Sequence, residues 1–228
     1  MKKFGLVIAD DCEFEPVQQC AKEMGGSAFE RHGNAYVKFC LENNIEVIAV
    51  LCGIGKVNAA FGAAALCCED QVDAVINFGL SGAIHGVYKN DLVIGTKYIE
   101  HDFDLTPMGY EISFKPQAVS HFTPDPTLFD QFMRACPQLK PCVLVTGDMF
   151  VSDSAKKKFL KERFNAGCCD MESAAIAQVC HKMGIPFVAL RCISDDADEN
   201  APESYTKENE QKKDNLMQIV HRALQMQS

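Results

Sequence analysis

Acidic residues gather at two points of the sequence where an apolar run gives way to a turn. Asp10, Asp11, Glu13 and Glu15 follow the predicted strand at residues 4–9, and Asp195, Asp196 and Asp198 follow the predicted strand at residues 187–192. In α/β sheets, ligands bind beyond the carboxyl ends of the strands, so acids in these places are candidates for binding and proton transfer. Each acid taken alone also fits a solvated turn, because runs of charge usually face water.

A further acid, Glu172, stands in the segment Asp170-Met171-Glu172-Ser173, at the predicted start of a helix. A carboxylate in the first turn of a helix is stabilised by the helix dipole. The position therefore has two interpretations, a ligand-binding carboxylate and a capping residue.

A glycine-containing turn at residues 53–56, Gly-Ile-Gly-Lys, follows a predicted strand but matches no nucleotide-binding motif. A phosphate loop would need a glycine in place of Val50 and a hydroxyl side chain in place of Val57. A dinucleotide fingerprint would need a glycine in place of Asn58. We therefore interpret the segment as a tight turn between a strand and a helix.

A second such turn, at residues 79–82, has the sequence Gly-Leu-Ser-Gly. Its register does not fit the Gly-x-Ser-x-Gly motif of hydrolases that use a serine nucleophile. Ser81 is either a hydrogen-bond donor to a ligand or a local cap.

The elements that must position these residues alternate between strands and helices, which is typical of an α/β sheet. Strands are predicted at residues 4–9, 34–41, 45–51, 74–78, 92–98, 142–145 and 187–192, and helices from Glu15 to Gly25 and at residues 59–68, 173–183 and 204–226. A hairpin signal at residues 42–44 makes part of the sheet antiparallel. Residues 99–127 contain four prolines and little periodicity, as a lid or an interface element would.

The composition describes a globular protein of 228 residues, 47% of them hydrophobic and 23% charged, which excludes a disordered chain. A net charge of −9 disfavours nucleic acid and anionic membranes as partners. No apolar run is long enough to span a membrane, and the N-terminal apolar run is too short for a signal peptide. We expect a cytoplasmic protein with one domain covering residues 1–228.

Twelve cysteines occur singly or as adjacent pairs, never at the spacing of zinc ligands. We expect them to be reduced and buried as small apolar side chains, and we expect no metal site.

Four segments together resemble one enzyme family along nearly the whole chain. They are Leu-Cys-Gly-Ile-Gly-Lys-Val-Asn-Ala-Ala at 51–60, Val-Thr-Gly-Asp-Met-Phe-Val at 145–151, Asp-Met-Glu-Ser-Ala-Ala at 170–175 and Arg-Cys-Ile-Ser-Asp-Asp-Ala-Asp at 191–198. Their order and spacing are similar to those of 5′-methylthioadenosine/S-adenosylhomocysteine nucleosidases, in the nucleoside phosphorylase superfamily. The resemblance implies a three-layer α/β/α sandwich with a mixed central sheet, a nucleoside phosphorylase-like fold, and no cofactor.

The resemblance also implies an activity, the hydrolysis of the N-glycosidic bond of an adenine nucleoside, with a role for each matching residue. Asp195 is the acid that protonates the leaving adenine, and Glu13 activates water. Residues implied to bind the substrate are Phe150, Val151, Met171, Glu172, Arg191, Ser194, Ser81 and Tyr205. Relatives of this kind pair as homodimers, so we expect residues 101–107 to lie at an interface that closes the neighbouring pocket.

Several residues depart from the family pattern. Asp10 replaces an apolar Met near the ribose and the 5′ group, where an acid would favour a polar or cationic substituent. Leu80 stands in place of a serine. Glu15 is an alternative to Glu13 as the residue that activates water.

Two other functions stay open at this point. One is a purine nucleoside phosphorylase, but phosphorylases hold phosphate with arginines after the first strand, where this chain has only acids. The other is a catalytically weak nucleoside-binding protein of the same fold. We favour hydrolysis, because an acidic segment repels phosphate and accepts water.

Overall fold

The computed structural model describes the main chain of residues 1–226 and the side chains of residues 1–204 and 216–226. Its strands are β1 (Lys2–Ile8), β2 (Ser27–Arg31), β3 (Asn34–Cys40), β4 (Ile45–Leu51), β5 (Ala74–Ala83), β6 (Leu92–Glu100), β7 (Lys140–Thr146), β8 (Cys168–Asp170) and β9 (Phe187–Asp195). Its helices are α1 (Asp11–Glu23), α2 (Lys56–Cys68), α3 (Pro126–Ala135), α4 (Ser154–Phe164), α5 (Ser173–Met183) and α6 (Ala201–Gln225), with a short 3₁₀ turn at Thr106–Met108.

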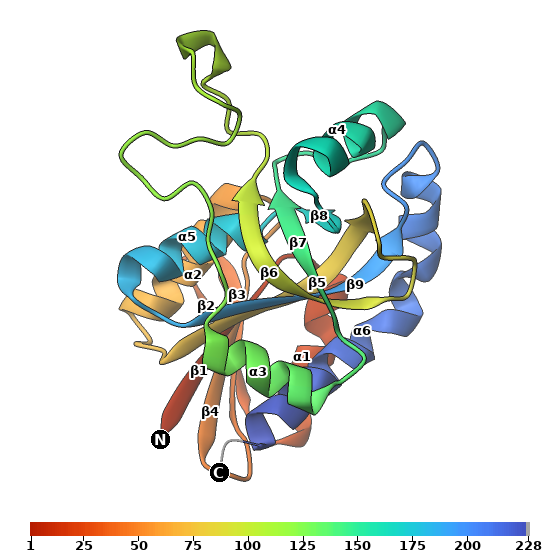
Figure 1. Cartoon of the computed structure of the whole chain (residues 1–228). Coiled ribbons are helices and arrows are strands. Elements are labelled where there is room, and N and C mark those ends of the chain that lie inside the picture. The colour runs from red at the N-terminus through yellow and green to blue at the C-terminus, as the bar shows by residue number, and fades with distance from the viewer. Residues whose placement is uncertain (227–228) are drawn as a thin grey trace.

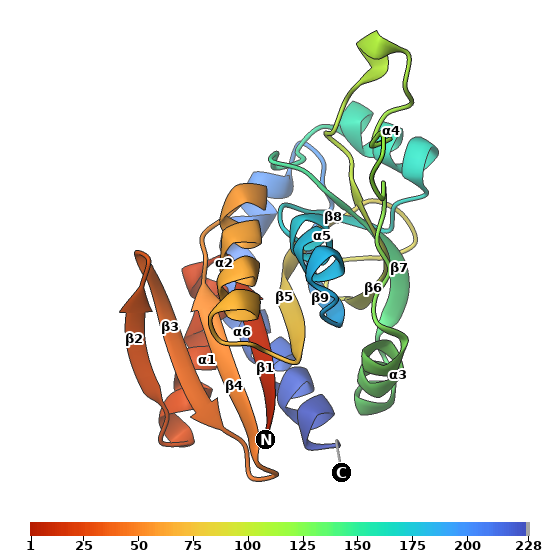
Figure 2. The ribbon, with the colours of Figure 1, turned by 90° about the vertical axis from the view of Figure 1, so that its left-hand side faces the viewer.

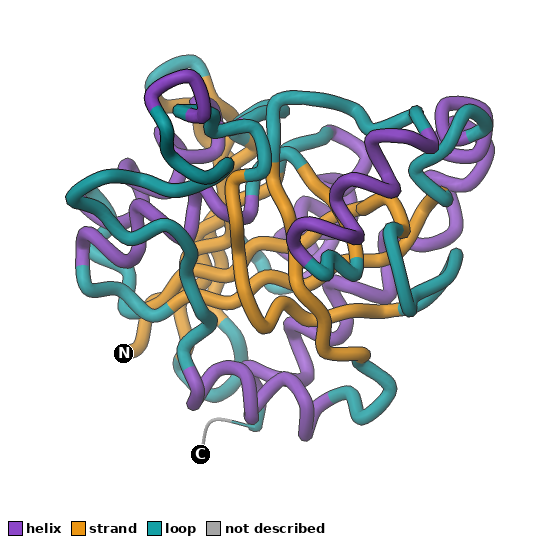
Figure 3. Tube along the Cα trace, turned by 45° about the horizontal axis from the view of Figure 1, so that its top comes forward, coloured by secondary structure: helices purple, strands orange, loops and turns teal. Residues whose placement is uncertain are grey.

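One mixed sheet holds the described strands in the order β2-β3-β4-β1-β5-β8-β7-β6-β9. Because β9 also pairs with β5, the strands β5, β8, β7, β6 and β9 close into a ring. The pairs β1–β4, β1–β5 and β5–β9 are parallel, whereas β3 runs antiparallel to both β2 and β4. The arrowheads of β6 and β7 point to the top of Figure 1, and Figure 3 shows loops gathered around that end.

Helices cover both faces of the open part of the sheet. Along β1, Leu6 and Ile8 belong to the apolar cluster that includes side chains of α1, α3 and α6, whereas Val7 belongs to the cluster of α2 and α5. On β5, Ile76 belongs to the first of these clusters and Val75 to the second. Figure 2 shows α2 and α5 side by side. The alternation is what a strand covered on both faces requires, and the expected three-layer sandwich with a mixed sheet is confirmed.

The start of α1 differs from the sequence-based expectation. The helix begins at Asp11 rather than Glu15, because the Asp10 side chain accepts the Cys12 N–H at 2.8 Å and caps it there. Pro16 consequently lies inside the helix instead of in its first turn. The earlier start brings Glu13 into the first turn, close to the carboxyl end of β1.

Other elements are longer than predicted or are not predicted at all. β5 continues to Ala83 and β9 to Asp195, so these strands carry site residues to their ends. The sequence patterns miss β2, which is almost fully exposed, and α4, which buries only Leu160. They also miss the three-residue strand β8 and α3, which lies at the end of the proline-rich stretch.

The twelve cysteines are free thiols, and most of them are buried or half-buried. Cys40 and Cys68 are exposed, contrary to expectation, because they fall on the outward side of β3 and at the end of α2. Among the described side chains, no group of three metal-ligating residues could hold an ion. No described helix has both the length and the apolar character needed to cross a membrane.

The segment around the 3₁₀ turn Thr106–Met108 projects from the body of the protein at the top of Figures 1 and 2. His101, which was expected at an interface, is 1% exposed and packs within its own chain against Gly147. A Cβ atom on Gly147 would meet the His101 ring at 2.5 Å. The part of the predicted interface segment that faces outward therefore begins after His101.

Candidate active site

A cavity lies across the carboxyl ends of six strands, β1, β4, β5, β7, β8 and β9. Eight of the ten predicted site residues line it: Glu13, Ser81, Phe150, Val151, Met171, Glu172, Ser194 and Asp195. Arg191 does not line it, and the side chain of Tyr205 lies outside the described residues. Segments far apart in the sequence thus meet at the carboxyl ends of strands, as the topology of an α/β sheet favours.

Glu13 enters the cavity from the first turn of α1. Its side chain is 8% exposed, and its Oε1 accepts the Leu80 N–H at 2.7 Å. Burial raises the pKa of Glu13 to about 8, although the Leu80 N–H and the charge of Arg191 act in the opposite direction. Glu15 is exposed and does not line the cavity, so the geometry favours Glu13 of the two alternatives.

The backbone of β5 gives the Glu13 carboxyl group room to lie against it. A Cβ atom on Gly79 would stand 2.5 Å from Glu13 Oε1 and 2.8 Å from Oε2, closer than real Cβ contacts. Gly79 therefore positions Glu13 by having no side chain, a role that the sequence pattern does not reveal.

The sequence left two interpretations for Glu172, a ligand-binding carboxylate and a helix cap, and in the structure Asp170 is the cap. Asp170 Oδ1 accepts the N–H groups of Glu172 and Ser173, both at 3.2 Å, and so it caps α5. Glu172 makes no side-chain cap bond, and its Oε1 instead accepts the Gly55 N–H at 3.0 Å. Burial, followed by the charge of Asp170, raises the pKa of Glu172 to about 7. Both carboxylates line the cavity, but Asp170 is the one that caps the helix.

The turn at residues 53–56 takes part in the site although it is no phosphate loop. Gly53 and Gly55 have φ angles of +89° and +99°, which glycine adopts without strain. This conformation lets the Gly55 N–H point to Glu172 and places Ile54 in the wall of the cavity.

Arg191 lies behind the cavity wall rather than in it. It is 1% exposed, and its guanidinium donates to Asp170 Oδ2 at 3.1 Å, to Ser173 Oγ at 2.8 Å and to Asn77. Its charge lowers the pKa values of Glu13 and Glu172 against the effect of burial. The structure thus gives Arg191 an electrostatic and structural role behind the wall, and its expected place near the sugar edge stays a prediction.

Asp195 lies at the end of β9 and is 2% exposed. Its Oδ2 accepts the Ser194 hydroxyl at 2.7 Å, and its Oδ1 accepts the Ala197 N–H at 2.8 Å. Burial raises its pKa in spite of these bonds. Gly82 on β5 makes room for the carboxyl group, since a Cβ atom there would lie 3.0 Å from Asp195 Oδ1.

Ser81 reaches the cavity from β5. Its hydroxyl donates to the Cys169 carbonyl at 2.6 Å, which ties β5 to β8. It is therefore not a local cap, and its own oxygen remains an acceptor in the cavity wall.

The loop at 147–151 forms an apolar rim with Met149, Phe150 and Val151. Met149 and Phe150 are 47% and 43% exposed at the mouth, whereas Val151 is buried. The neighbouring Asp148 accepts the Lys56 N–H at 2.7 Å, so it joins this loop to the start of α2.

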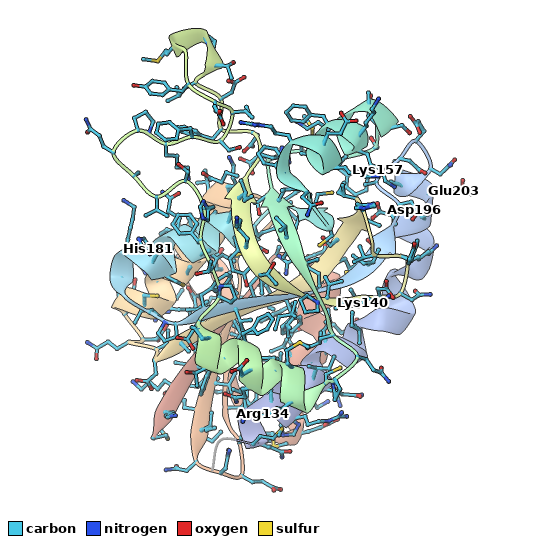
Figure 4. All side chains as sticks on the ribbon, in the orientation of Figure 1. Arg134, Lys140, Lys157, His181, Asp196 and Glu203 are labelled. Atoms are coloured by element: carbon cyan, nitrogen blue, oxygen red, sulfur yellow. The ribbon has the colours of Figure 1, made fainter. Side chains whose placement is uncertain are left out.

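Helix α4 holds the segment that follows Asp195. The Lys157 ammonium donates to the carbonyl of Asp196, and Figure 4 shows these two residues together. Ser154 at the start of α4 also donates to the Glu199 carboxylate, through its N–H at 3.1 Å and its hydroxyl at 2.7 Å. The two contacts fix the strand end that carries Asp195.

Half of the cavity wall comes from residues outside the ten predicted site residues: Ala9, Asp10, Ile54, Leu80, Gly82, Met149, Cys169 and Asp170. Of these, Asp10 was expected near the ribose and the 5′ group as a departure from the family pattern. Each stands within three positions of a predicted site residue or in a turn that follows a strand. Their location at strand ends was the available signal, but apolar side chains in such places do not themselves indicate chemistry.

Carboxyl groups whose pKa values are raised are suited to acid and base catalysis near neutral pH. Asp195 and Glu13 enter the cavity from β9 and α1, with the end of β5 between them. Such a pair can protonate a leaving group on one side of a bond and accept a proton from water on the other. The apolar rim beside Asp195 suits a flat aromatic base.

The sequence model of the phosphorylase superfamily matches residues 3–225. The chain belongs to this superfamily. The 5′-methylthioadenosine/S-adenosylhomocysteine nucleosidase of Halalkalibacterium halodurans is 40% identical over 166 residues, which are 70% of this chain and 72% of the relative. That of Shewanella oneidensis is 38% identical over 164 residues, or 69% of this chain and 70% of the relative. The expected membership of the nucleosidase family is confirmed.

Solved structures of the superfamily agree with the whole fold. The nucleosidase of the same name from Neisseria meningitidis, in complex with methylthio-immucillin-A, has a TM-score of 0.90 at 31% identity, covering 98% of this chain and 99% of that one. Futalosine hydrolase of Helicobacter pylori has a TM-score of 0.92 at 27% identity, covering 98% and 97%. The nucleoside phosphorylase-like fold expected from the sequence is confirmed.

Proposed function

We propose that this chain hydrolyses the N-glycosidic bond of adenine nucleosides of the 5′-methylthioadenosine and S-adenosylhomocysteine type and releases adenine. The observation that carries the proposal is the meeting of Glu13, Glu172 and Asp195 in one cavity, all with raised pKa values. The curated relatives that bear this activity in their names support it.

In the proposed reaction, the bond between C1′ of the ribose and N9 of the adenine breaks, and its electron pair goes to the base. The Asp195 carboxylic acid donates its proton to N7, so the base leaves as neutral adenine. Phe150 stacks on the base and the main chain of Val151 bonds its edge. The raised pKa of Asp195 keeps a proton available for this step.

The ribosyl cation that forms is attacked by water at C1′. Glu13 accepts the proton of that water in its ionised form, which a pKa of about 8 makes strongly basic although it is the minor form near neutral pH. Glu172, next to Met171, binds the ribose hydroxyls and stabilises the positive charge on the sugar. The positive charge of Arg191 lowers the pKa values of Glu13 and Glu172, so burial raises them less than it otherwise would.

The wall of the cavity favours water over phosphate as the nucleophile. Among the described residues, it contains five acids, Asp10, Glu13, Asp170, Glu172 and Asp195, and no Lys, Arg or His. A phosphate dianion needs cationic or multiple N–H donors, and acids repel it. The phosphorylase alternative is therefore not favoured.

We further propose that the chain acts as a homodimer of single-domain protomers in the cytoplasm. The family match over residues 3–225 supports one domain, and the free thiols support a reducing compartment. Exposed large apolar side chains support the dimer: Ile54 in the cavity wall and Val57 and Phe61 on α2 are 51%, 79% and 49% exposed. The carboxylate of Asp102 pairs with the Lys56 ammonium at the start of α2 at 2.7 Å, so the segment that leads to the projecting turn begins next to α2.

The function is tested by incubating the protein with 5′-methylthioadenosine, S-adenosylhomocysteine, 5′-deoxyadenosine and adenosine in phosphate-free buffer. We expect release of adenine from at least one of the first two. Turnover that appears only after phosphate is added would identify a phosphorylase instead. Tight binding of adenine without cleavage of any nucleoside would identify a binding protein.

A further inference from the structure

Asp10 lies in the cavity but has no part in the proposed chemistry. It follows β1 directly, is half-buried, and lines the cavity next to Ala9. Its Oδ1 accepts the Cys12 N–H at 2.8 Å as the cap of α1. The salt bridges of the described side chains include none to Asp10.

The strand order fixes where Asp10 stands along the cavity. Asp195 ends β9, the Glu13 carboxyl group lies on β5, and Asp10 follows β1, in a row of three adjacent strands. Neighbouring strands are about 4.8 Å apart, so the strands that lead to Asp10 and Asp195 lie roughly 10 Å apart across β5. A nucleoside with its base at Asp195 and C1′ near Glu13 therefore extends its sugar substituent toward Asp10 and the exposed Ile54.

The ionisable side chains that share the described cavity wall with Asp10 are all acids. The four other acids of the described wall are at least nine-tenths buried, and the described wall holds no cation. The charge of Asp10 reaches Glu13, whose pKa it helps to raise. A half-buried carboxylate in such a cavity attracts a cation and repels an anion more strongly than it would in water.

We propose that Asp10 selects adenine nucleosides whose 5′ substituent carries a positive charge, such as a sulfonium or an ammonium group, over neutral and anionic ones. The inference rests on the proposed nucleosidase function, because that function sets the direction of the nucleoside in the cavity. It makes Asp10 a residue that determines specificity and not a catalytic residue.

The test uses Asp10→Asn and two nucleosides that differ by one methyl cation: 5′-methylthioadenosine and its S-methyl sulfonium. Asn caps a helix as well as Asp does, so the variant removes the charge while it keeps the start of α1. We expect the preference for the sulfonium over the thioether, measured as a ratio of kcat/KM, to fall about tenfold or more. Asp11→Asn, which removes an exposed acid outside the cavity, is the matched control and should keep the wild-type ratio.

Dissociation constants of the two nucleosides, measured by calorimetry, give the same ratio without turnover. If the ratio of dissociation constants depends on Asp10 but the protein cleaves neither compound, the inference is supported and the proposed function is overturned. Cleavage of both compounds with equal ratios in wild type and Asp10→Asn would overturn the inference and leave the function standing. Added salt should lower the sulfonium preference of the wild type but not of the variant, because it screens the charge.

Discussion

Asp170 and Glu172 are two residues apart and have different tasks. Asp170 accepts hydrogen bonds from Thr146, from the main chain at the start of α5 and from Arg191, so all of its bonds are internal. Because Asp170 caps the helix, the Glu172 carboxylate is available to the cavity. In this motif with two acids, the hydrogen-bond partners identify Asp170 as the helix cap and leave Glu172 as the candidate ligand-binding carboxylate, which the sequence does not distinguish.

Asp195→Asn should abolish most of the turnover while it preserves the fold. Asn can still accept the Ala197 N–H, and the Ser194 hydroxyl can still donate to the Ser81 carbonyl, which lies at 3.3 Å. The variant has no acidic proton for the leaving base, so we expect kcat to fall by about 10²–10⁴-fold. Adenine release measures the loss, and an unchanged urea midpoint shows that the protein is folded. Turnover at the wild-type rate would remove Asp195 from the role of the acid.

Glu13→Gln should change how stability depends on pH. Because the folded-state pKa of Glu13 is raised from 4.5 to about 8, its contribution is fully present below about pH 4.5 and is lost as pH rises through about 8. The wild type should therefore lose on the order of 5 kcal/mol of unfolding free energy relative to Glu13→Gln across this range. Urea unfolding at about pH 5 and about pH 9 measures the difference.

The control for that experiment is Glu15→Gln, which changes the exposed acid on the same helix. Its pH profile should run parallel to that of the wild type. If Glu13→Gln also ran parallel to the wild type, Glu13 would not be protonated in the folded protein at neutral pH.

At the scale of elements, the site depends on how closely α1 approaches β5. The cap at Asp10 sets the start of the helix, the first turn carries Glu13, and the bare backbone at Gly79 receives its carboxyl group. Leu80 contributes through its main-chain N–H, which any residue at that position supplies. The hydrogen bond to the Glu13 carboxyl group therefore does not depend on whether a serine or Leu80 stands at this position.

Gly79→Ala should lower kcat with little change in the binding of adenine. The new Cβ atom would meet the Glu13 carboxyl group, which must move away from the Leu80 N–H, while Asp195 is untouched. A misplaced general base costs about 10²-fold or more. Steady-state kinetics and adenine titration separate the two effects.

Gly5→Ala is a matched control, because Gly5 is a buried glycine of the neighbouring strand whose Cβ atom would contact Leu66 at 3.0 Å. It should lower stability by packing conflict but leave kcat near the wild-type value below the unfolding temperature. Equal losses of kcat in both variants would mean that Gly79 acts through stability alone.

At the scale of the whole molecule, apolar side chains exposed on α2 and on the segment between β6 and α3 have a common explanation in the proposed dimer. Val57 and Phe61 lie one turn apart on α2, and Met108, Tyr110 and Phe114 are exposed on the projecting segment. Exposed apolar side chains gathered in this way are typical of protein interfaces.

Val57→Asp should convert the proposed dimer into a monomer at micromolar concentration. Val57 is 79% exposed in the protomer, so the substitution leaves the fold intact but would bury a charge in the interface. Sedimentation velocity measures the mass. Tyr88→Asp, which changes a 68% exposed residue in the turn between β5 and β6, should remain dimeric. A wild type that sediments as a monomer would contradict the proposal.

Most of the sheet was predictable from sequence, because its strands are apolar on both faces and end in turn residues. The α5 bounds at 173–183 match the prediction, since Gly184 ends the helix in the left-handed conformation. The closed ring was not predictable, because β8 has only three residues and pairing between distant strands leaves no local pattern. α4 was missed for a related reason, since it buries only Leu160 and shows no apolar stripe.

Eight of the ten site residues were placed in the cavity by motif resemblance. Arg191 lies behind the cavity wall, which a sequence motif does not reveal, because a motif does not show whether a residue faces the ligand or the residues behind it. Gly79 and Gly55 were missed because they act through main-chain geometry. Such roles become visible only when the packing partner from another segment is known.

The ring of five strands also determines which parts of the protein unfold locally. Each of its strands pairs on both sides, so the amide hydrogens of β5 and β9 are shielded on both edges and exchange only when the ring opens. Asp195 and Asp170 are attached to this ring, whereas Glu13 is attached to α1 outside it. We therefore expect local opening that frees α1 to remove the proposed base and leave the proposed acid in place. A partly opened protein should then still bind adenine at Asp195 without turning over.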